Sequence, residues 1–387
     1  MKLSRDLKLL SFSLFLWALG EGLFIYILPL YMQSLGANSV QIGALFSFGA
    51  VVMAAALIPA GLAVDRFGPR SGLVSGWILG AVAGAIMAAA KDISWFAVGW
   101  GLYRLTAWVM PAISSYVTHG RGDMPPERAL TAVSSMYQAG LIISPTLGGY
   151  IGEHYGLRAN FIVGTIIFAV SSISILLISH QAPHPHEHRV RPVELLSNRR
   201  FLGFMALIFL IMAGLYVGFD FAPKFLNDVK GINIQQLGWV GTASAVGGFA
   251  LNQYLGRRPP RRGLILAIGF ILCYAAILLR ASWVGWFAVG YFLRASYNVA
   301  RSLVDAMVTR VVSPSQYGVA FAVSETVVTL ATAVSPYLAG WLYTASPALP
   351  FQITLALAPV AMMLIWFFVP RAVSVEHKPL VVAVSAD

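Results

Sequence analysis

Runs of about twenty apolar residues recur along this chain and constrain its fold more than any other feature. Of its 387 residues, 58% are hydrophobic and 11% are charged, whereas soluble domains carry roughly 25% charged residues. A helix needs about 20 apolar residues to cross a lipid bilayer. The chain is therefore predicted to be an all-α integral membrane protein, and its length leaves no room for a large soluble catalytic domain.

Twelve apolar segments are predicted to be transmembrane helices. They cover residues 9–33, 39–64, 71–90, 94–118, 129–152, 159–179, 201–227, 235–256, 263–280, 283–309, 317–343 and 350–370. The first segment continues to Met32 without a small-residue cleavage pattern, so we expect a retained helix and not a signal peptide. An even number of helices places both chain termini on the same side of the membrane.

The positions of the basic residues predict the orientation of the chain. Eighteen of the 26 Lys and Arg residues lie in the N-terminal stub, the C-terminal tail and the loops on the same side as these ends, and five lie in the opposite loops. Because basic residues accumulate in cytoplasmic loops, we expect both termini in the cytoplasm of a cell whose plasma or inner membrane holds this multi-pass chain. The net charge of +11 then reflects topology and not a nucleic-acid partner.

The two sides of the hydrophilic segment 180–200 repeat each other. WFAVG at residues 95–99 recurs at 286–290, and SPTLGG at 144–149 recurs as SPYLAG at 335–340, both after 191 residues. This spacing predicts two six-helix halves in the same orientation. The expected parts are an N-terminal half at 1–179, a cytoplasmic linker at 180–200, a C-terminal half at 201–370 and a cytoplasmic tail at 371–387.

Two motifs resemble those of the major facilitator superfamily. The run GLAVDRFGPR at residues 61–70 is similar to the family signature G-x-L-a-D-r-x-G-r-K/R, and Gly140 followed by SPTLGG at 144–149 resembles the motif of its drug/proton antiporters, with Ser144 replacing one glycine. The resemblance covers nearly the whole chain. It implies the family fold of twelve helices, alternating access between two halves, and no cofactor, with a proton gradient as the energy source.

The resemblance also implies roles for the residues of these motifs. A cytoplasmic gate is expected at Gly61, Asp65, Arg66, Gly68 and Arg70, and a helix-five motif at Gly140, Pro145, Gly148 and Gly149. Asp65 can cap the N-terminus of a neighbouring helix, such as the one that opens at residues 313–315, and can pair with Arg66 or Arg70. The alternative is that these charges only fix topology. The second half carries Asn252 in place of the acid, so we expect an asymmetric gate.

Charged residues inside the predicted helices are costly and usually face a cavity or a partner. A substrate and proton pathway is predicted at Glu21, Arg104, Asp220, Arg294 and Asn298. The four charged members lie in segments one, four, seven and ten, which line the central cavity in the resembling family. We expect Glu21 to bind the proton, with Arg104 beside it.

A second charged set lies nearer the cytoplasmic ends of the tenth and eleventh segments. It comprises Arg301, Asp305 and Glu325, for which we predict an inner gate with an ion pair from Arg301 to Glu325 or to Asp305. Arg294 and Asn298 extend this set along one face of the tenth segment. The alternative for Arg301 and Asp305 is an ion pair that only holds helices together.

These observations predict a secondary active transporter that works by alternating access, and the motifs favour proton-coupled efflux of a small organic molecule. The alternative is an organic-anion or metabolite carrier, because Arg104 and Arg294 occupy nearly equivalent places in the two halves and can clamp an anion. A polytopic membrane enzyme or scaffold is a remote alternative, since no convergent catalytic group or metal site is evident. We expect a monomer in the lipid bilayer that binds substrate and protons, and no ATP-binding loop is present.

Overall fold

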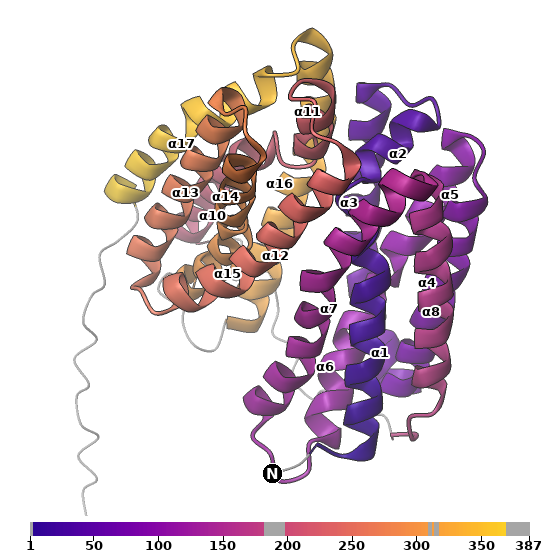
Figure 1. The fold of residues 1–387 in the computed structure, drawn as a ribbon. Coiled ribbons are helices and arrows are strands. Elements are labelled where there is room, and N and C mark those ends of the chain that lie inside the picture. The colour runs from indigo at the N-terminus through magenta and orange to yellow at the C-terminus, as the bar shows by residue number, and fades with distance from the viewer. Residues whose placement is uncertain (1–2, 182–197, 309–311, 313–316, 369–387) are drawn as a thin grey trace, which may run out of the picture.

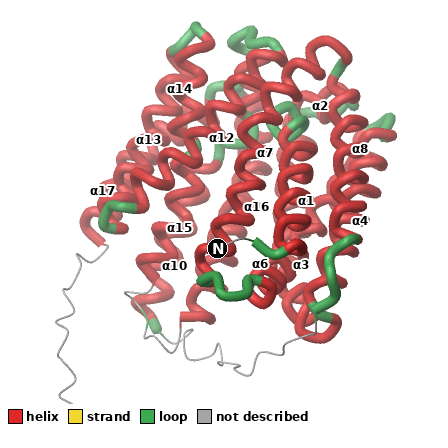
Figure 2. Tube along the Cα trace, turned by 60° about the horizontal axis from the view of Figure 1, so that its bottom comes forward, coloured by secondary structure: helices red, strands yellow, loops and turns green. Residues whose placement is uncertain are grey.

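The computed structural model describes residues 3–181, 198–308, 312 and 317–368, and within these ranges the regular structure is helical, with no strand. The helices run roughly side by side and are joined by short loops (Figures 1 and 2). This architecture agrees with the predicted all-α fold.

The N-terminal half contains eight α-helices and one short 3₁₀ helix. They are α1 (Arg5–Gly22), α2 (Leu28–Ser34), α3 (Ser39–Phe67), α4 (Pro69–Ala89), α5 (Ile93–Leu105), η1 (Thr106–Trp108), α6 (Val109–Gly120), α7 (Pro126–Tyr155) and α8 (Leu157–Leu176). The described part of the C-terminal half follows the same order. Its helices are α10 (Arg199–Tyr216), α11 (Ala222–Asp228), α12 (Ile234–Gly256), α13 (Pro260–Arg280), α14 (Val284–Arg294), α15 (Ser296–Val308), α16 (Tyr317–Ala345) and α17 (Leu349–Phe368).

Helices lie in all twelve predicted segments, but segments one, four, seven and ten are each broken into two helices that the sequence analysis treated as one. In segments one and seven the second helix carries Pro29 or Pro223 in its first turn, where the missing N–H of proline costs no hydrogen bond. In segment four η1 separates the two helices, and in segment ten Ala295 does. The breaks therefore fall at equivalent places in the two halves.

Five of the described helices have the length and composition to cross a membrane as uninterrupted apolar segments. These segments are Ser39–Leu57, Pro69–Ala89, Leu157–Leu176, Pro260–Arg280 and Leu349–Phe367. Several other helices are shortened by the breaks, which explains why apolar length alone does not identify them.

The turns that follow the first break of each half repeat in atomic detail. Asn38 caps α3 and Asn233 caps α12, and each forms a capping box with the glutamine three residues later. A capping box satisfies the free N–H groups of the first helical turn. Just before each cap, Gly36 and Gly231 adopt φ angles of 90° and 67°, which glycine adopts without steric strain. The internal repeat is thus visible in the local structure and not only in the sequence.

The two halves meet mainly through α3 against α16 and α7 against α12, with a smaller contact between α2 and α11. The close contacts involve glycine: a Cβ on Gly43 would overlap the carbonyl oxygen of Pro336, and a Cβ on Gly238 would overlap that of Pro145. Figure 1 shows α7 and α12 meeting near α2 and α11 and diverging toward the end where the N-terminus lies. We call these the α2–α11 end and the N-terminal end of the molecule.

Candidate substrate and proton site

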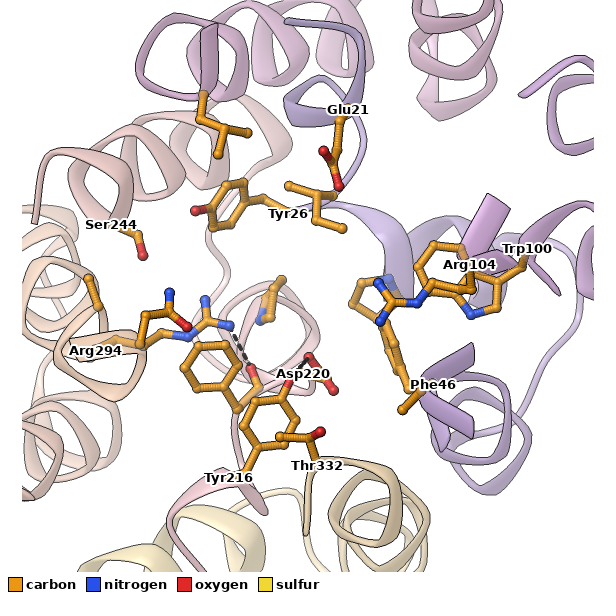
Figure 3. A pocket seen from close by; sticks show the side chains of 18 of the residues that line it. Glu21, Tyr26, Phe46, Trp100, Arg104, Tyr216, Asp220, Ser244, Arg294 and Thr332 are labelled. Atoms are coloured by element: carbon orange, nitrogen blue, oxygen red, sulfur yellow. Dashed lines mark hydrogen bonds between the residues drawn. The ribbon is translucent and has the colours of Figure 1, made fainter. Parts of the chain in front are cut away.

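A central cavity of about 290 Å³ lies between the two halves and is lined by both of them. Its wall includes all five residues predicted for the pathway, which are Glu21, Arg104, Asp220, Arg294 and Asn298. In Figure 3 the side chains of Glu21 and Arg104 approach the cavity from one half, and those of Asp220 and Arg294 approach it from the other. Aromatic rings from both halves complete the wall.

The four charged residues of this cavity lie at the four helix breaks. Glu21 is in the last turn of α1, and Asp220 is in the turn between α10 and α11. Arg104 is in the last turn of α5, and Arg294 is the last residue of α14. Broken helices place backbone polar groups at the depth of a binding site, and a helix C-terminus stabilises a cation. The helix ends at the breaks therefore help to hold Arg104 and Arg294 within the membrane region, whereas Glu21 and Asp220 depend on other partners.

The two carboxylates of the cavity are each bound by a tyrosine. The hydroxyl of Tyr137 donates to Glu21 Oε2 over 2.7 Å, and that of Tyr216 donates to Asp220 Oδ1 over 3.1 Å. A phenol can form a hydrogen bond with both the ionised and the protonated form of a carboxyl group, because its hydroxyl both donates and accepts. This arrangement suits carboxyl groups that gain and lose protons.

Arg104 does not pair with Glu21, although both line the same cavity. Its Nε donates to the carbonyl oxygen of Gly49 over 3.3 Å, and its Nη2 lies 2.9 Å from the sulfur of Met53. The guanidinium carbon is 5.4 Å from the centre of the Trp100 ring. Arg104 thus lies in the same cavity wall as Glu21, as expected, but each of the two side chains has its own partners.

Arg294 is almost completely enclosed, with 6% of its surface exposed. Its Nη2 donates to the carbonyl oxygen of Phe219 over 3.1 Å, and its guanidinium carbon lies 3.5 Å from the centre of the Phe219 ring and 4.8 Å from that of Tyr291. Its buried Nε has no hydrogen-bond partner among the residues that the structure describes. Among the described residues, no carboxylate oxygen lies within 4.0 Å of either Arg294 or Arg104.

The second charged set forms contacts within the C-terminal half. Arg301 of α15 forms an ion pair with Glu325 of α16, which confirms one of the two predicted pairings. Asp305 accepts instead from the hydroxyl of Ser324 over 2.9 Å, so the alternative Arg301–Asp305 pair is absent from the described contacts. Since both helices belong to one half, this pair does not bridge the halves. The predicted polar face of the tenth segment is interrupted at Ala295, between α14 and α15.

The residues predicted for the cytoplasmic gate lie around the turn between α3 and α4. Gly68 ends α3 with a φ of 78°, which explains the glycine at this motif position. Arg70 donates to the carbonyl oxygens of Ile178 over 2.9 Å and Leu176 over 3.1 Å, beyond and at the end of α8. Arg66 is exposed and lies 5.2 Å from the centre of the ring of its neighbour Phe67.

The remaining parts of the predicted gate are Gly61, Asp65 and the helix start expected at residues 313–315. Gly61 and Asp65 belong to α3, but the side chain of Asp65 and residues 313–315 lie outside the described residues. Arg70 therefore binds its own half, while the predicted cap from Asp65 stays a prediction.

The residues of the helix-five motif pack against two different helices. A Cβ on Gly140 or Gly148 would overlap α1, at Phe15 and Leu23 respectively. Gly149 and the carbonyl of Pro145 lie against Gly238 of α12, in the other half. The motif therefore allows close approach within the N-terminal half and across the interface.

The tyrosines that bind the two carboxylates are among the residues of the central cavity that the sequence analysis missed. Tyr216 lies four residues before Asp220, and this spacing on a helix could have indicated a hydrogen bond. Tyr137 lies 116 residues from Glu21 and gives no such signal.

The fold agrees with the comparisons to known proteins. The family model for the Major Facilitator Superfamily matches residues 10–304. The chain belongs to this family.

Multidrug resistance protein 1 of Bacillus subtilis is 24% identical over 212 residues, 54% of each chain. Multidrug resistance protein 2 of the same organism is 28% identical over 179 residues, 45% of this chain and 44% of that protein. The quinolone resistance protein NorA of Staphylococcus aureus is 24% identical over 177 residues, 46% of each chain. The chain thus spans about half the length of the curated relatives it matches.

Solved structures share the fold at low sequence identity. The nucleoside transporter NupG superimposes with a TM-score of 0.77 at 14% identity, covering 94% of this chain and 98% of that one. A bacterial homolog of the human lysosomal transporter Spinster superimposes with a TM-score of 0.71 at 14% identity, covering 94% and 95%. At such identities the likeness concerns the fold alone.

Proposed function

We propose that this chain is a secondary transporter, and not an enzyme, that exports a small organic molecule in exchange for protons by alternating access. The observation that carries the proposal is the central cavity, which both halves line and in which two carboxylates and two guanidinium groups lie at helix breaks. A rocking movement of one half against the other would expose such a midplane site to either side in turn. The names of the multidrug and quinolone resistance relatives support export.

The proposed orientation follows from the basic residues. With the Lys- and Arg-rich N-terminal end in the cytoplasm, the α2–α11 end faces outward, and the close glycine contacts between the halves lie at that outer end. The conformation is then closed to the outside. Since one chain supplies the whole cavity, the functional unit is a monomer in the plasma or inner membrane.

Glu21 is our candidate for the coupling proton. We expect Glu21→Gln to abolish pH-driven transport, at least about hundredfold in rate, because the amide cannot cycle between a charged and a neutral form. The measurement is flux of a panel of organic compounds, a quinolone among them, in proteoliposomes with an imposed pH gradient. The hydrogen bond from the Tyr137 hydroxyl can be kept by the amide oxygen, so the variant should fold.

The matched control is Glu127→Gln, an exposed carboxylate in the first turn of α7. It should transport like the wild type, and both variants should elute as folded protein. Full pH-driven transport by Glu21→Gln would contradict the assignment and move it to Asp220.

A second candidate function is an organic-anion or metabolite carrier, and the enclosed Arg294 favours it. In such a carrier, protonation of Glu21 and Asp220 would remove the negative charge that repels an anion from the central cavity, so proton and anion would move together. An inward proton gradient would then drive uptake and not export. The sign of the flux under an imposed gradient distinguishes the two candidates.

A further inference from the structure

A second cavity, of about 360 Å³, lies entirely within the N-terminal half. We call it the side cavity. Its wall is mostly apolar and aromatic, and includes Leu14, Trp17, Met53, Trp77, Tyr103 and Met110. It shares Glu21, Arg104 and Tyr137 with the central cavity. The two cavities therefore adjoin at these three side chains, and neither the sequence motifs nor the proposed function uses the side cavity.

Arg294, in the opposite wall of the central cavity, forms no ion pair with a described carboxylate. Its side chain is enclosed, and its Nε has no hydrogen-bond partner in the described part of the chain. The faces of Phe219 and Tyr291 compensate for only part of the lost hydration. A guanidinium group offers five N–H donors, and the hydrogen bond to the carbonyl oxygen of Phe219 uses one of them. An anionic group on a ligand would satisfy the rest.

We propose that the central and side cavities form one two-part binding site for an amphipathic organic anion. Its anionic group binds Arg294, and its apolar part passes Glu21 and Arg104 into the side cavity. This inference rests on the proposed transport function but not on its direction. A ligand bound in this way contacts both halves at once, so its binding is sensitive to their relative position, as alternating access requires.

Cationic and neutral ligands fit the same walls less well. The two carboxylates of the central cavity already accept hydrogen bonds from Tyr137 and Tyr216, and a cation would share the cavity with Arg104 and Arg294, neither of which forms an ion pair with a described carboxylate. A neutral ligand would leave Arg294 enclosed without an anion. The apolar wall of the side cavity, in turn, offers few partners for a second charged group and favours an apolar body.

The first experiment tests the charge. Binding of phenylacetate, phenylbutyrate and phenyloctanoate to the purified full chain is measured by equilibrium dialysis, against their primary amides and amines and a protein-free detergent blank. We expect the carboxylates to bind at least about tenfold more tightly than the amides and amines. Arg294→Gln should remove this preference, whereas Arg280→Gln, an exposed arginine at the end of α13, should keep it.

Equal binding of acid and amide by the wild type would overturn the proposal without reference to any variant. The same conclusion follows if folded Arg294→Gln still prefers the acid.

The second experiment tests the apolar part. Affinity should rise about threefold to fourfold for each methylene that enters the side cavity, so phenyloctanoate should bind most tightly. Ala107→Leu adds volume at a residue that lines only the side cavity. This variant should lower the affinity for phenyloctanoate by more than about fivefold and leave the affinity for phenylacetate unchanged. Ala85→Leu, at an exposed position of α4, is the matched control.

Affinity that does not depend on chain length, or that Ala107→Leu does not change, would overturn the role of the side cavity. These binding results are independent of transport. Binding as predicted without flux in proteoliposomes would refute the proposed function and keep the site, and flux without these binding preferences would refute the site alone.

Discussion

The two ends of the molecule differ in what their polar and small residues contact. At the α2–α11 end the contacts cross between the halves: Gly43 lies against Pro336, Gly238 lies against Pro145, and the Nζ of Lys224 donates to Gln33 Oε1 over 2.6 Å. At the N-terminal end the described charged groups bind within their own half. There Arg70 binds carbonyl groups after and within α8, and Arg301 binds Glu325.

This difference indicates which contacts stabilise the present conformation. Residues with no side chain let two backbones approach closely, and any added atom must separate them. Contacts within one half, by contrast, persist when the halves move as rigid bodies. We therefore expect substitutions at the α2–α11 end to change the conformational equilibrium, and substitutions of the charged pairs at the N-terminal end to change mainly the stability of one half.

The largest effect is expected from Gly238→Leu. Its side chain would overlap the Pro145 carbonyl and the backbone of Gly149. The overlap should destabilise the closed state by about 1–3 kcal/mol relative to the open state. That loss shifts the population of closed molecules about five- to hundredfold. Electron paramagnetic resonance between spin labels at Ser34 and Val229, exposed residues of opposite halves, should report longer distances. The labels require a Cys273→Ser background, because Cys273 is exposed.

Gly256→Leu is the control for this prediction. It lies on the same helix, α12, and a Cβ there meets no atom within 4 Å. Its distance distribution should match that of the wild type. An unchanged distribution in Gly238→Leu would show that the glycine contacts do not hold the halves together.

A smaller effect is expected from Asp65→Asn at the other end. If the predicted cap forms when the cytoplasmic side closes, its loss should raise the energy of that state by about 1 kcal/mol, which slows turnover about fivefold. Substrate affinity at equilibrium should change little, since Asp65 belongs to the last turn of α3, at the N-terminal end of the molecule. Single-turnover and steady-state flux measurements separate these effects. Normal turnover in Asp65→Asn would contradict the predicted cap and favour the alternative that Asp65 only fixes the topology of the chain.

The central cavity could be predicted from sequence because charges are rare within membrane segments. Glu21, Arg104, Asp220 and Arg294 are conspicuous in apolar runs, and the cost of isolating each in lipid leaves a shared cavity as the natural place for them. The capping signals at Asn38 and Asn233 and the repeat spacing are likewise local or periodic. Such signals can be recognised in a single sequence.

The helix breaks and the partners of each charge could not be predicted in this way. The break at Ala295 has no proline beside it, and Pro111, in the first turn of α6, does not by itself indicate the 3₁₀ turn η1 before it. The partner of Arg70 is the end of α8, and the partner of Glu21 is Tyr137, more than 100 residues away in each case. These contacts depend on how helices dock, which hydrophobic periodicity does not specify.

The smallest effect is expected from the Arg301–Glu325 pair. Sequence reasoning placed these charges in apolar helices, where an unpaired charge would cost several kcal/mol, but 30% and 43% of their side-chain surfaces are exposed. Water therefore screens the pair, and a double-mutant cycle with Arg301→Gln and Glu325→Gln should give a coupling energy of about 1 kcal/mol or less. Thermal or denaturant unfolding in detergent measures it. Arg301→Gln alone should destabilise more than the double variant, because it leaves Glu325 without its cation. Strictly additive losses would mean that the two residues act separately, and a change in the Ser34–Val229 distances would mean that this pair, and not only the α2–α11 end, contributes to the conformational equilibrium.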